Sequence, residues 1–454
     1  MLEIVRGIIE TYGMIGVGEL ILVGVSGGPD SIALLHCLHC LSESMQFSVH
    51  VVHINHGIRP EAIEEADFVA KFAGNFGIGV TIAKLDGVAL KDQGSFQARA
   101  REERMKIFAD VSQKIGATKV ALGHNANDQA ETILQRLLRG GGSGGLSGIL
   151  PIRDSIIHPL LFVSRKQIEA YLSQNRLDYR HDSSNFKPIY LRNRIRLELL
   201  PMLEANFNPR LVETLGKTAL ILQEENNYMD LESEKNLAKL AQPLSCGIFL
   251  PLEAFELELP LIRRVVRKTF ARLSGDPRGL EYDHVERVIK FARQGESGGY
   301  IELPGGLRLY KEQAGVVFTR GEIGMPTLRE SVLQIPGETY LDTLGITITA
   351  RIVDNPSVLQ LPEGNWSVVF DFNSIKFPII VRSRSMGDKI WRNGSYTKLK
   401  EIFSRQKLPV RLRESIPILV QDDEVLWIPG LIRSDRAKVL PSTPKILELI
   451  AWKN

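Results

Sequence analysis

Short apolar runs alternate with longer amphipathic stretches over the first 140 residues of this chain. The apolar runs are typical of buried strands, and the amphipathic stretches place apolar residues at helical spacing. The expected strands are Leu20–Val25, Val49–Ile54, Val80–Leu85 and Lys119–Leu122, and the expected helices are Ser31–Leu41, Pro60–Phe76, Phe96–Ile115 and Asn127–Leu138. This alternation predicts an α/β fold, a doubly wound parallel sheet with helices on both faces. Ligands of such sheets bind at the carboxyl ends of the strands.

The pattern changes after residue 140, where the run Gly140–Gly145 predicts a flexible hinge or a loop that faces a substrate. A helical pattern follows from about residue 211 to residue 298, and hairpin-like strands are expected within Tyr300–Thr319. We therefore expect an α/β domain at 1–210, a mostly helical domain at 211–325, a linking β segment at 326–366, and a small basic α/β or β-rich domain at 367–454.

Composition narrows the class of protein. The 454 residues suffice for two to four domains with separate cores, and the net charge of +3 is too small to indicate nucleic-acid binding by itself. Three cysteines, at 37, 40 and 246, are too few and too badly spaced for a disulfide framework. The first residues lack the layout of a secretory signal, and no apolar run approaches the ~20 residues of a membrane-spanning helix. We expect a cytoplasmic protein without a membrane partner.

The most informative motif lies directly behind the first expected strand and consists of Ser26, Gly27, Gly28, Pro29, Asp30 and Ser31. Because this turn opens onto a helix, unsatisfied N–H groups and the helix dipole favour an anion such as a nucleotide phosphate. The glycines permit close backbone approach, and the serines add hydroxyl donors. The turn lacks the glycine order of a dinucleotide site and the lysine of a Walker A loop. The alternative is an ordinary tight turn.

Two further strand ends carry polar residues that would face the same crevice. His53, Asn55 and His56 follow the second strand, where they could reach a nucleotide or simply cap the strand. Asp128 and Glu131 follow the fourth strand and share one face near the start of a helix. Carboxylates there can hold a metal ion, receive an ammonium group, or cap the helix.

Arg101 and Arg104 lie three residues apart on an expected helix, so both could address one polyphosphate. A solvated helix with local Glu–Arg pairs has the same pattern, and the spacing alone favours that interpretation.

Together these motifs resemble the tRNA(Ile)-lysidine synthetases, a branch of the PP-loop ATP pyrophosphatases. The phosphate loop alone indicates only the superfamily, whereas the lysidine branch is indicated by the later motifs in their order. The resemblance covers about 200 residues densely and then resumes near the end, and its later motifs are His53–Arg59, Ala100–Arg104, Gly123–Thr132, Arg136–Gly140, His158–Leu161, Asp182–Asn185, Arg192–Arg196, Gly387–Asp388 and Lys398–Phe403.

In these enzymes ATP adenylates the C2 carbonyl oxygen of the wobble cytidine in an isoleucine tRNA with a CAU anticodon. The ε-amine of free L-lysine then displaces AMP and gives lysidine, which pairs with A instead of G. The resemblance implies ATP as substrate, Mg²⁺ as cofactor, and tRNA(Ile) and L-lysine as partners. It leaves open whether the enzyme acts as a monomer or as a homodimer. ATP contacts are implied for Ser26–Ser31, His53, Asn55 and His56.

The resemblance also implies roles for individual residues. Asp30 would lie near the metal ion or the phosphates, and Arg101 would stabilise charge during adenylation. Asp128 and Glu131 would receive the ammonium group of lysine, and Arg194 would lie near the substrates.

A basic segment near the end of the chain supports an RNA partner. Residues 382–413 contain ten Lys or Arg against two acids, with three aromatic residues interleaved. Such a segment can neutralise phosphates while aromatic rings stack on bases, although a solvated basic face has the same composition. The family's C-terminal domains grip the tRNA acceptor stem. Contacts to tRNA are therefore implied for Arg192, Arg196, Arg382, Arg384, Lys389, Lys398 and Lys400.

Three alternatives remain open. A tRNA thiolase would depend on Cys37 and Cys40, but these lie in an apolar helix, where buried structural cysteines are common. A small-molecule amidating synthetase would exchange ATP and pyrophosphate without RNA. A tRNA-binding protein with a decayed catalytic site is favoured slightly by Asn127, which stands where the family usually has the first of two aspartates.

Overall fold

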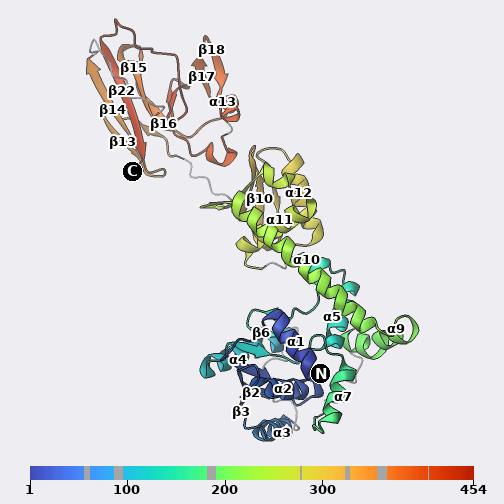
Figure 1. Cartoon of the computed structure of the whole chain (residues 1–454). Coiled ribbons are helices and arrows are strands. Elements are labelled where there is room, and N and C mark those ends of the chain that lie inside the picture. Colours follow the sequence, from blue (N-terminus) through green and yellow to red (C-terminus); the bar gives the residue numbers. More distant parts are fainter. Residues whose placement is uncertain are drawn as a thin grey trace. The chain divides into compact units, whose positions relative to one another are not determined.

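The computed structural model describes residues 1–55, 62–85, 96–180, 191–276, 279–322, 328–354, 366–406 and 408–453. Of the expected site residues, His56 lies outside the described residues. The chain divides into two compact units, Met1–Tyr228 and Met229–Asn454, which are described separately (Figure 1).

The first unit contains the predicted parallel sheet, in the strand order β3-β2-β1-β4-β6-β5. Its strands are β1 (Leu20–Gly24), β2 (Ser48–Asn55), β3 (Gly79–Lys84), β4 (Lys119–Ala121), β5 (Ile152–Arg153) and β6 (Ile156–Ile157). Its helices are α1 (Leu2–Tyr12), α2 (Pro29–Ser42), α3 (Ala62–Gly74), α4 (Phe96–Ile115), α5 (Ala126–Leu138), α6 (Ser143–Leu146), α7 (Arg165–Gln174), α8 (Leu191–Arg194), the π-helix η2 (Ile195–Leu199), α9 (Leu200–Asn206) and the first part of α10 (Leu211–Leu240). All four predicted strands and all four predicted helices are confirmed over the described residues, and the predicted helix start at Pro60 and Glu61 lies outside them.

The sheet is buried on both faces, as expected for parallel strands. On one face, side chains of α1, α2, α3 and α7 form a core with Ile21 and Val23 of β1. On the other face, Leu22 packs with Phe108 of α4. β1 pairs in parallel with β2 on one side and with β4 on the other. The strand order reverses at β1, because β2 and β3 are added on one side of it and β4 on the other. Parallel sheets bind ligands at such a point, so the crevice lies at the carboxyl ends of β1 and β4.

The glycine-rich stretch after α5, predicted as a flexible hinge or a substrate-facing loop, makes contacts with neighbouring elements. Arg136 donates to the carbonyls of Gly145 and Gly148 at 2.7 and 2.9 Å. From α10, Asn226 donates to the Ser147 hydroxyl at 2.7 Å. A short helix, α6, forms within the stretch.

The second unit begins with a lobe of helices and an antiparallel sheet. Besides the end of α10, its helices are α11 (Leu259–Ser274), α12 (Tyr282–Gln294) and the 3-10 helix η3 (Leu252–Glu256), and its sheet has the order β7 (Gln242–Leu244), β8 (Gly247–Pro251), β11 (Gly315–Arg320), β10 (Leu307–Lys311), β9 (Tyr300–Glu302). β9 and β10 form the predicted hairpin around Pro304–Gly306. The strands β7 and β8 were not predicted.

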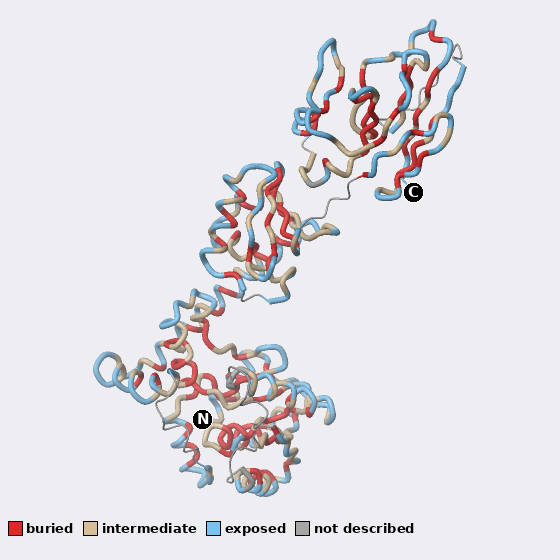
Figure 2. The backbone as a smooth tube through the Cα atoms, turned by 180° about the vertical axis from the view of Figure 1, so that it is seen from behind, coloured by how far each residue is buried: buried red, intermediate tan, exposed pale blue. Residues whose placement is uncertain are grey.

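The C-terminal lobe consists of two packed sheets, which confirms a β-rich end domain. One sheet has the strands β12 (Ser331–Val332), β16 (Ile380–Arg382), β19 (Ile418–Gln421), β20 (Glu424–Ile428), β17 (Lys389–Arg392) and β18 (Ser395–Lys398), with β21 (Ile432–Arg433) beside β20, and the other has β13 (Gly337–Leu341), β14 (Ile346–Asp354), β22 (Lys445–Lys453) and β15 (Ser367–Asp371). One core joins Trp427 and Leu419 of the first sheet to Phe370 and Leu449 of the second. Figure 2 shows buried backbone, in red, along both sheets of this lobe. The helix α13 (Leu399–Arg405) follows β18.

Across the described residues, every helix is too short or too polar to cross a lipid bilayer.

Candidate active site

The predicted phosphate loop connects β1 to α2. Gly27 has a φ of +89°, a left-handed conformation that glycine adopts without strain. The Ser31 hydroxyl donates to the Gly28 carbonyl at 2.9 Å and accepts the N–H of Ser26 at 3.2 Å. The serines therefore fix the shape of the loop itself. The N–H groups in the first turn of α2 have no intrahelical acceptor, and they are available to an anion.

The loop after β4 packs directly against the phosphate loop. A Cβ atom at Gly123 would lie 3.2 Å from the backbone carbonyl of Asp30, so any side chain there would crowd the phosphate loop. Asn125 donates from Nδ2 to Asp30 Oδ1 at 2.9 Å. Its Oδ1 accepts the N–H groups of Asn127 and Asp128, which caps α5. The predicted convergence of these two strand ends is confirmed.

Asp30 is a carboxylate without a full counter-charge. Burial, and next the charge of Asp128, raise the pKa of Asp30 to about 6, although Arg165, Asn125 and Arg196 act in the opposite direction. A buried carboxyl group in this situation favours a proton or a bound cation.

Asp128 and Glu131, 9% and 1% exposed, are both paired with guanidinium groups. Arg192 donates to Glu131 Oε2 at 3.1 Å and to Asp128 Oδ1 at 3.0 Å. Arg196 donates to Glu131 Oε1 at 2.6 Å and Oε2 at 3.0 Å, and to Asp128 Oδ1 at 3.0 Å. These four side chains, called the carboxylate–arginine cluster below, are balanced in charge.

His53 lies at the carboxyl end of β2 and is 2% exposed. Its Nδ1 is 2.9 Å from the Val25 carbonyl, to which it must donate. Its Nε2 is buried and, within the part of the chain that the structure describes, has no partner. Asn55 ends the same strand, and its carbonyl accepts the N–H of Leu85 at 2.8 Å. A buried acceptor therefore lies beside the end of β1.

Comparisons with known proteins agree with this geometry. Residues 9–203 match the PP-loop domain family, and residues 379–450 match the TilS substrate C-terminal domain family. The chain is 36% identical to the tRNA(Ile)-lysidine synthase of Symbiobacterium thermophilum, over 96% of this chain and 94% of that protein. This chain belongs to the tRNA(Ile)-lysidine synthase family. It is also 34% identical to the tRNA(Ile)-lysidine synthase of Caldanaerobacter subterraneus, over 98% and 97% of the two chains.

Family membership makes the protein an ATP-using ligase of the PP-loop class, and it confirms the predicted fold. The chain is 32% identical to the tRNA(Ile)-lysidine synthase of Clostridium tetani, over 99% of this chain and 98% of that protein. The resemblance therefore extends over nearly the whole chain, beyond the stretches that carried it in the sequence.

The two arginines expected to assist the lysidine reaction are placed differently. Arg101 is exposed on α4 and close enough to act electrostatically on His158, whose pKa is lowered to about 4 by burial and, to a smaller extent, by His124 and Arg101. Arg194 pairs with Glu198 at 3.6 Å and has a side chain 61% exposed. Arg101 thus acts electrostatically on the strand-end histidines, whereas Arg194 pairs within its own helical segment and not with the carboxylate–arginine cluster.

The basic residues expected to bind tRNA in the C-terminal lobe form two groups. Arg382 makes a bidentate pair with Asp388 at 2.8 and 2.9 Å, with little of either side chain exposed. Arg384 pairs with Glu414 at 2.7 Å. These guanidinium groups are already committed to carboxylates.

The lysines of the same lobe face solvent instead. Lys398 and Lys400 are exposed at the start of α13. Lys389 lies 4.4 Å from the centre of the Tyr396 ring, which meets the Trp391 ring at 4.9 Å. Exposed cations next to aromatic rings are the combination that single-stranded or bulged RNA contacts.

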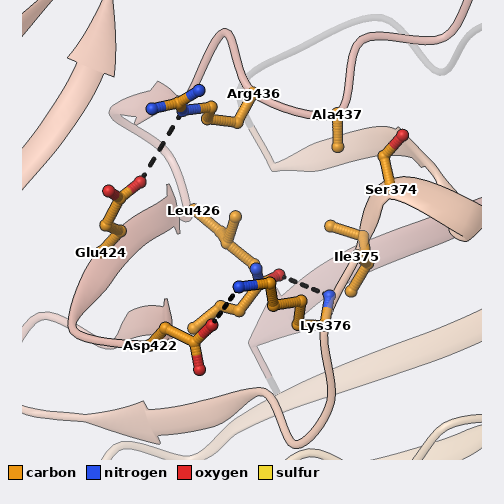
Figure 3. Close-up of a pocket in the computed structure, with 9 residues that line it drawn as sticks. Ser374, Ile375, Lys376, Asp422, Glu424, Leu426, Arg436 and Ala437 are labelled. Atoms are coloured by element: carbon orange, nitrogen blue, oxygen red, sulfur yellow. Dashed lines mark hydrogen bonds and ion pairs between the residues drawn. The ribbon is translucent and has the colours of Figure 1, made fainter.

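A pocket of about 470 Å³ lies elsewhere in this lobe (Figure 3). Its rim holds the pairs Lys376–Asp422 at 3.0 Å and Arg436–Glu424 at 3.8 Å, above apolar side chains such as Leu426. Each cation faces an acid, so the pocket offers no net charge to a phosphate. None of the residues expected to carry chemistry lines it.

Two contacts at the site go beyond what the motifs indicate. The Asn-x-x-Asp spacing of Asn125 and Asp128 is typical of a helix cap, but it does not reveal the bond to Asp30. Asn127, the departure from the family pattern, accepts the backbone N–H of Arg165 on its Oδ1 at 3.0 Å. It therefore anchors the start of α7, a role that an amide oxygen performs without a charge.

Proposed function

We propose that this protein ligates free L-lysine to C2 of the wobble cytidine in an isoleucine tRNA with a CAU anticodon. ATP first adenylates the C2 oxygen and releases pyrophosphate. The lysine ε-ammonium loses a proton, the resulting amine attacks C2, the C2–O bond breaks, and the oxygen leaves with AMP. The observation that carries this proposal is the convergence of the phosphate loop with the carboxylate-bearing segment after β4 at the β1/β4 crevice, together with the names of the relatives.

The nucleotide binds the phosphate loop, Ser26–Ser31, where the first turn of α2 presents N–H groups to its phosphates. The buried Nε2 of His53 is an acceptor that a hydroxyl or amino group of the nucleotide can satisfy. Asn55 and His56 contribute from the same strand end, and Arg101 stabilises the negative charge that develops during adenylation.

The donor set fits Mg²⁺. Magnesium in nucleotide sites binds through one or two carboxylates and the substrate phosphates, and Asp30 is a half-buried carboxyl group in the phosphate loop that favours a cation. Mg²⁺ held there would neutralise the pyrophosphate that leaves. Asn125 keeps the Asp30 carboxylate oriented toward the crevice through its 2.9 Å hydrogen bond.

Lysine binds through its ammonium group at Asp128 and Glu131, the two buried carboxylates nearest to Asp30 along α5. The target cytidine must leave its stack to reach this crevice. Arg194, exposed on α8, contacts the substrates from the rim.

The tRNA contacts the middle and C-terminal parts of the chain. Lys389, Lys398 and Lys400 are exposed and neutralise phosphates, whereas Arg382 and Arg384 support the same surface through their carboxylate partners.

The test is to incubate the full chain with tRNA transcripts, ATP, Mg²⁺ and isotopically labelled lysine, followed by mass spectrometry of the digested tRNA. We expect label on the anticodon cytidine of the CAU isoleucine transcript only, together with stoichiometric AMP. Label-free tRNA, or ATP consumed solely to ADP, would contradict the proposal.

Thiolation is the second candidate, and the burial of Cys37 argues against it, although Cys40, expected to be buried in the same helix, is exposed. Burial raises the pKa of Cys37 to about 12, so its thiol stays protonated at neutral pH and cannot act as a sulfur nucleophile. A Cys37→Ser/Cys40→Ser double variant should keep lysidine formation, whereas complete loss of tRNA modification would favour a thiolase.

A further inference from the structure

The carboxylates proposed to hold lysine already accept three hydrogen bonds each. Asp128 Oδ1 and Glu131 Oε2 each accept from both Arg192 and Arg196. Of the other two oxygens, Asp128 Oδ2 accepts the N–H of Asn125 at 3.1 Å and Glu131 Oε1 accepts from Arg196. An ammonium group would bring three more donors and a third positive charge to two negative charges. Since each carboxylate already uses three of its roughly four lone-pair sites, the three donors of an ammonium group find too few acceptors in this arrangement.

The two arginines are not equivalent in how firmly they are held. Arg196 makes three hydrogen bonds to the carboxylates, its side chain is 27% exposed, and it follows the buried Ile195 in η2. Arg192 makes two hydrogen bonds, its side chain is 40% exposed, and it lies in the short helix α8. Withdrawal of the Arg192 side chain therefore breaks fewer hydrogen bonds than withdrawal of Arg196, and its guanidinium group reaches solvent more readily.

We propose that Arg192 is a gate for lysine: in the free enzyme its guanidinium occupies the cation position that the ammonium group takes during the reaction. This inference rests on the proposed function. Arg196 stays as the permanent partner of Asp128 and Glu131. When Arg192 withdraws, one guanidinium faces two carboxylates, and one ammonium group restores the balance of charge.

The gate also gives the site a preference for a cationic amino acid. An uncharged side chain cannot replace the guanidinium, because it would leave a buried carboxylate without a counter-charge. In the wild-type protein, apparent lysine affinity is reduced by the fraction of molecules in which Arg192 occupies the position. Removal of the Arg192 charge should therefore strengthen lysine binding, which a residue with a purely structural role would not do.

The test is the Arg192→Gln variant of the full chain, with KM for lysine measured at saturating ATP and CAU isoleucine transcript. We expect KM for lysine to fall by roughly three- to tenfold. Pyrophosphate release without lysine, measured in parallel, reports the adenylation step separately. Arg165→Gln is the matched control, because Arg165 acts electrostatically on Asp30 but pairs with Glu169 rather than with the cluster.

An unchanged or higher KM for lysine in Arg192→Gln overturns the gate, as does an equal fall in Arg165→Gln, which would indicate a general electrostatic effect. Arg192→Lys serves if the glutamine variant does not fold, and its KM should fall less because an ammonium group still occupies the position. Wild-type protein that adenylates no tRNA overturns the proposed function itself, whereas normal lysidine formation with an unchanged KM overturns only the gate.

Discussion

The carboxylate–arginine cluster and the basic segment of the C-terminal lobe look alike as sequences and differ as structures. Both contain closely spaced arginines with few acids nearby in the chain. In the cluster, Arg192 and Arg196 find their partners some 60 residues away, at Asp128 and Glu131. In the C-terminal lobe, Arg382 is paired in the same way, but Lys398 and Lys400 stay exposed. Whether a basic residue can reach RNA is thus decided by tertiary partners, not by charge count.

The largest expected effect is on catalysis, at the crevice next to the carboxylate–arginine cluster. Asp30→Ala should lower tRNA-dependent AMP release by at least about 1,000-fold, because it removes the carboxylate proposed for Mg²⁺ and the phosphates. Binding of tRNA should change less than about twofold, since phosphate contacts elsewhere supply it. Asp67→Ala, an exposed acid on α3, is the control. Retained turnover in Asp30→Ala would remove Asp30 from the site.

The next prediction compares how much stability is lost when a buried ion pair and a partly exposed ion pair are broken. Arg196→Ala leaves Glu131, 1% exposed, short of two hydrogen bonds and a counter-charge, and should destabilise the first unit by about 3 kcal/mol. Arg384→Ala breaks a pair whose side chains are about one third exposed and should cost less than about 1 kcal/mol. Urea unfolding, monitored by hydrogen exchange of backbone amides in α5 and in β19, would measure the stability of each unit separately. Equal losses of stability in the two variants would contradict this difference between the buried pair and the exposed pair.

A smaller effect concerns the pH dependence of stability. The folded-state pKa of Asp30, about 6, lies above the ordinary value of 3.8. The native state therefore binds more protons than the unfolded state between these values, and its stability falls as pH rises through them. Asp30→Asn should abolish this loss. The free energy of unfolding of the variant, relative to that of the wild type, should therefore rise by at most about 3 kcal/mol between pH 4 and 7. Thermal unfolding without nucleotide or metal measures this. A constant difference across that range would contradict the raised pKa.

Local patterns predicted the parts of the fold that depend on local physics. The strands and helices around the phosphate loop follow from their apolar runs, and the crevice follows from the βα alternation. The carboxylate–arginine cluster could not be predicted, because nothing near Arg192 in sequence indicates a partner at Glu131. The contacts of Gly140–Gly145, predicted as a hinge or a substrate-facing loop, could not be predicted for the same reason: Arg136 and Asn226, which contact this region, belong to other elements. Tertiary partners override the intrinsic freedom of glycine there.

The smallest effect tests whether the exposed lysines carry the RNA contact. Lys398→Gln with Lys400→Gln should weaken tRNA binding by a few-fold at moderate salt and reduce the slope of log affinity against log salt by about one to two, since two phosphate contacts are lost. Folding should be unaffected, because neither lysine makes a described ion pair that holds the lobe together. Lys445→Gln with Lys453→Gln, on β22 of the same lobe, removes the same charge from another surface. If both double variants lower the slope equally, tRNA senses only the total charge of the lobe. If only the first does, the surface around α13 is where the RNA lies, and the aromatic pair Trp391–Tyr396 beside it becomes the next place to look for a base contact.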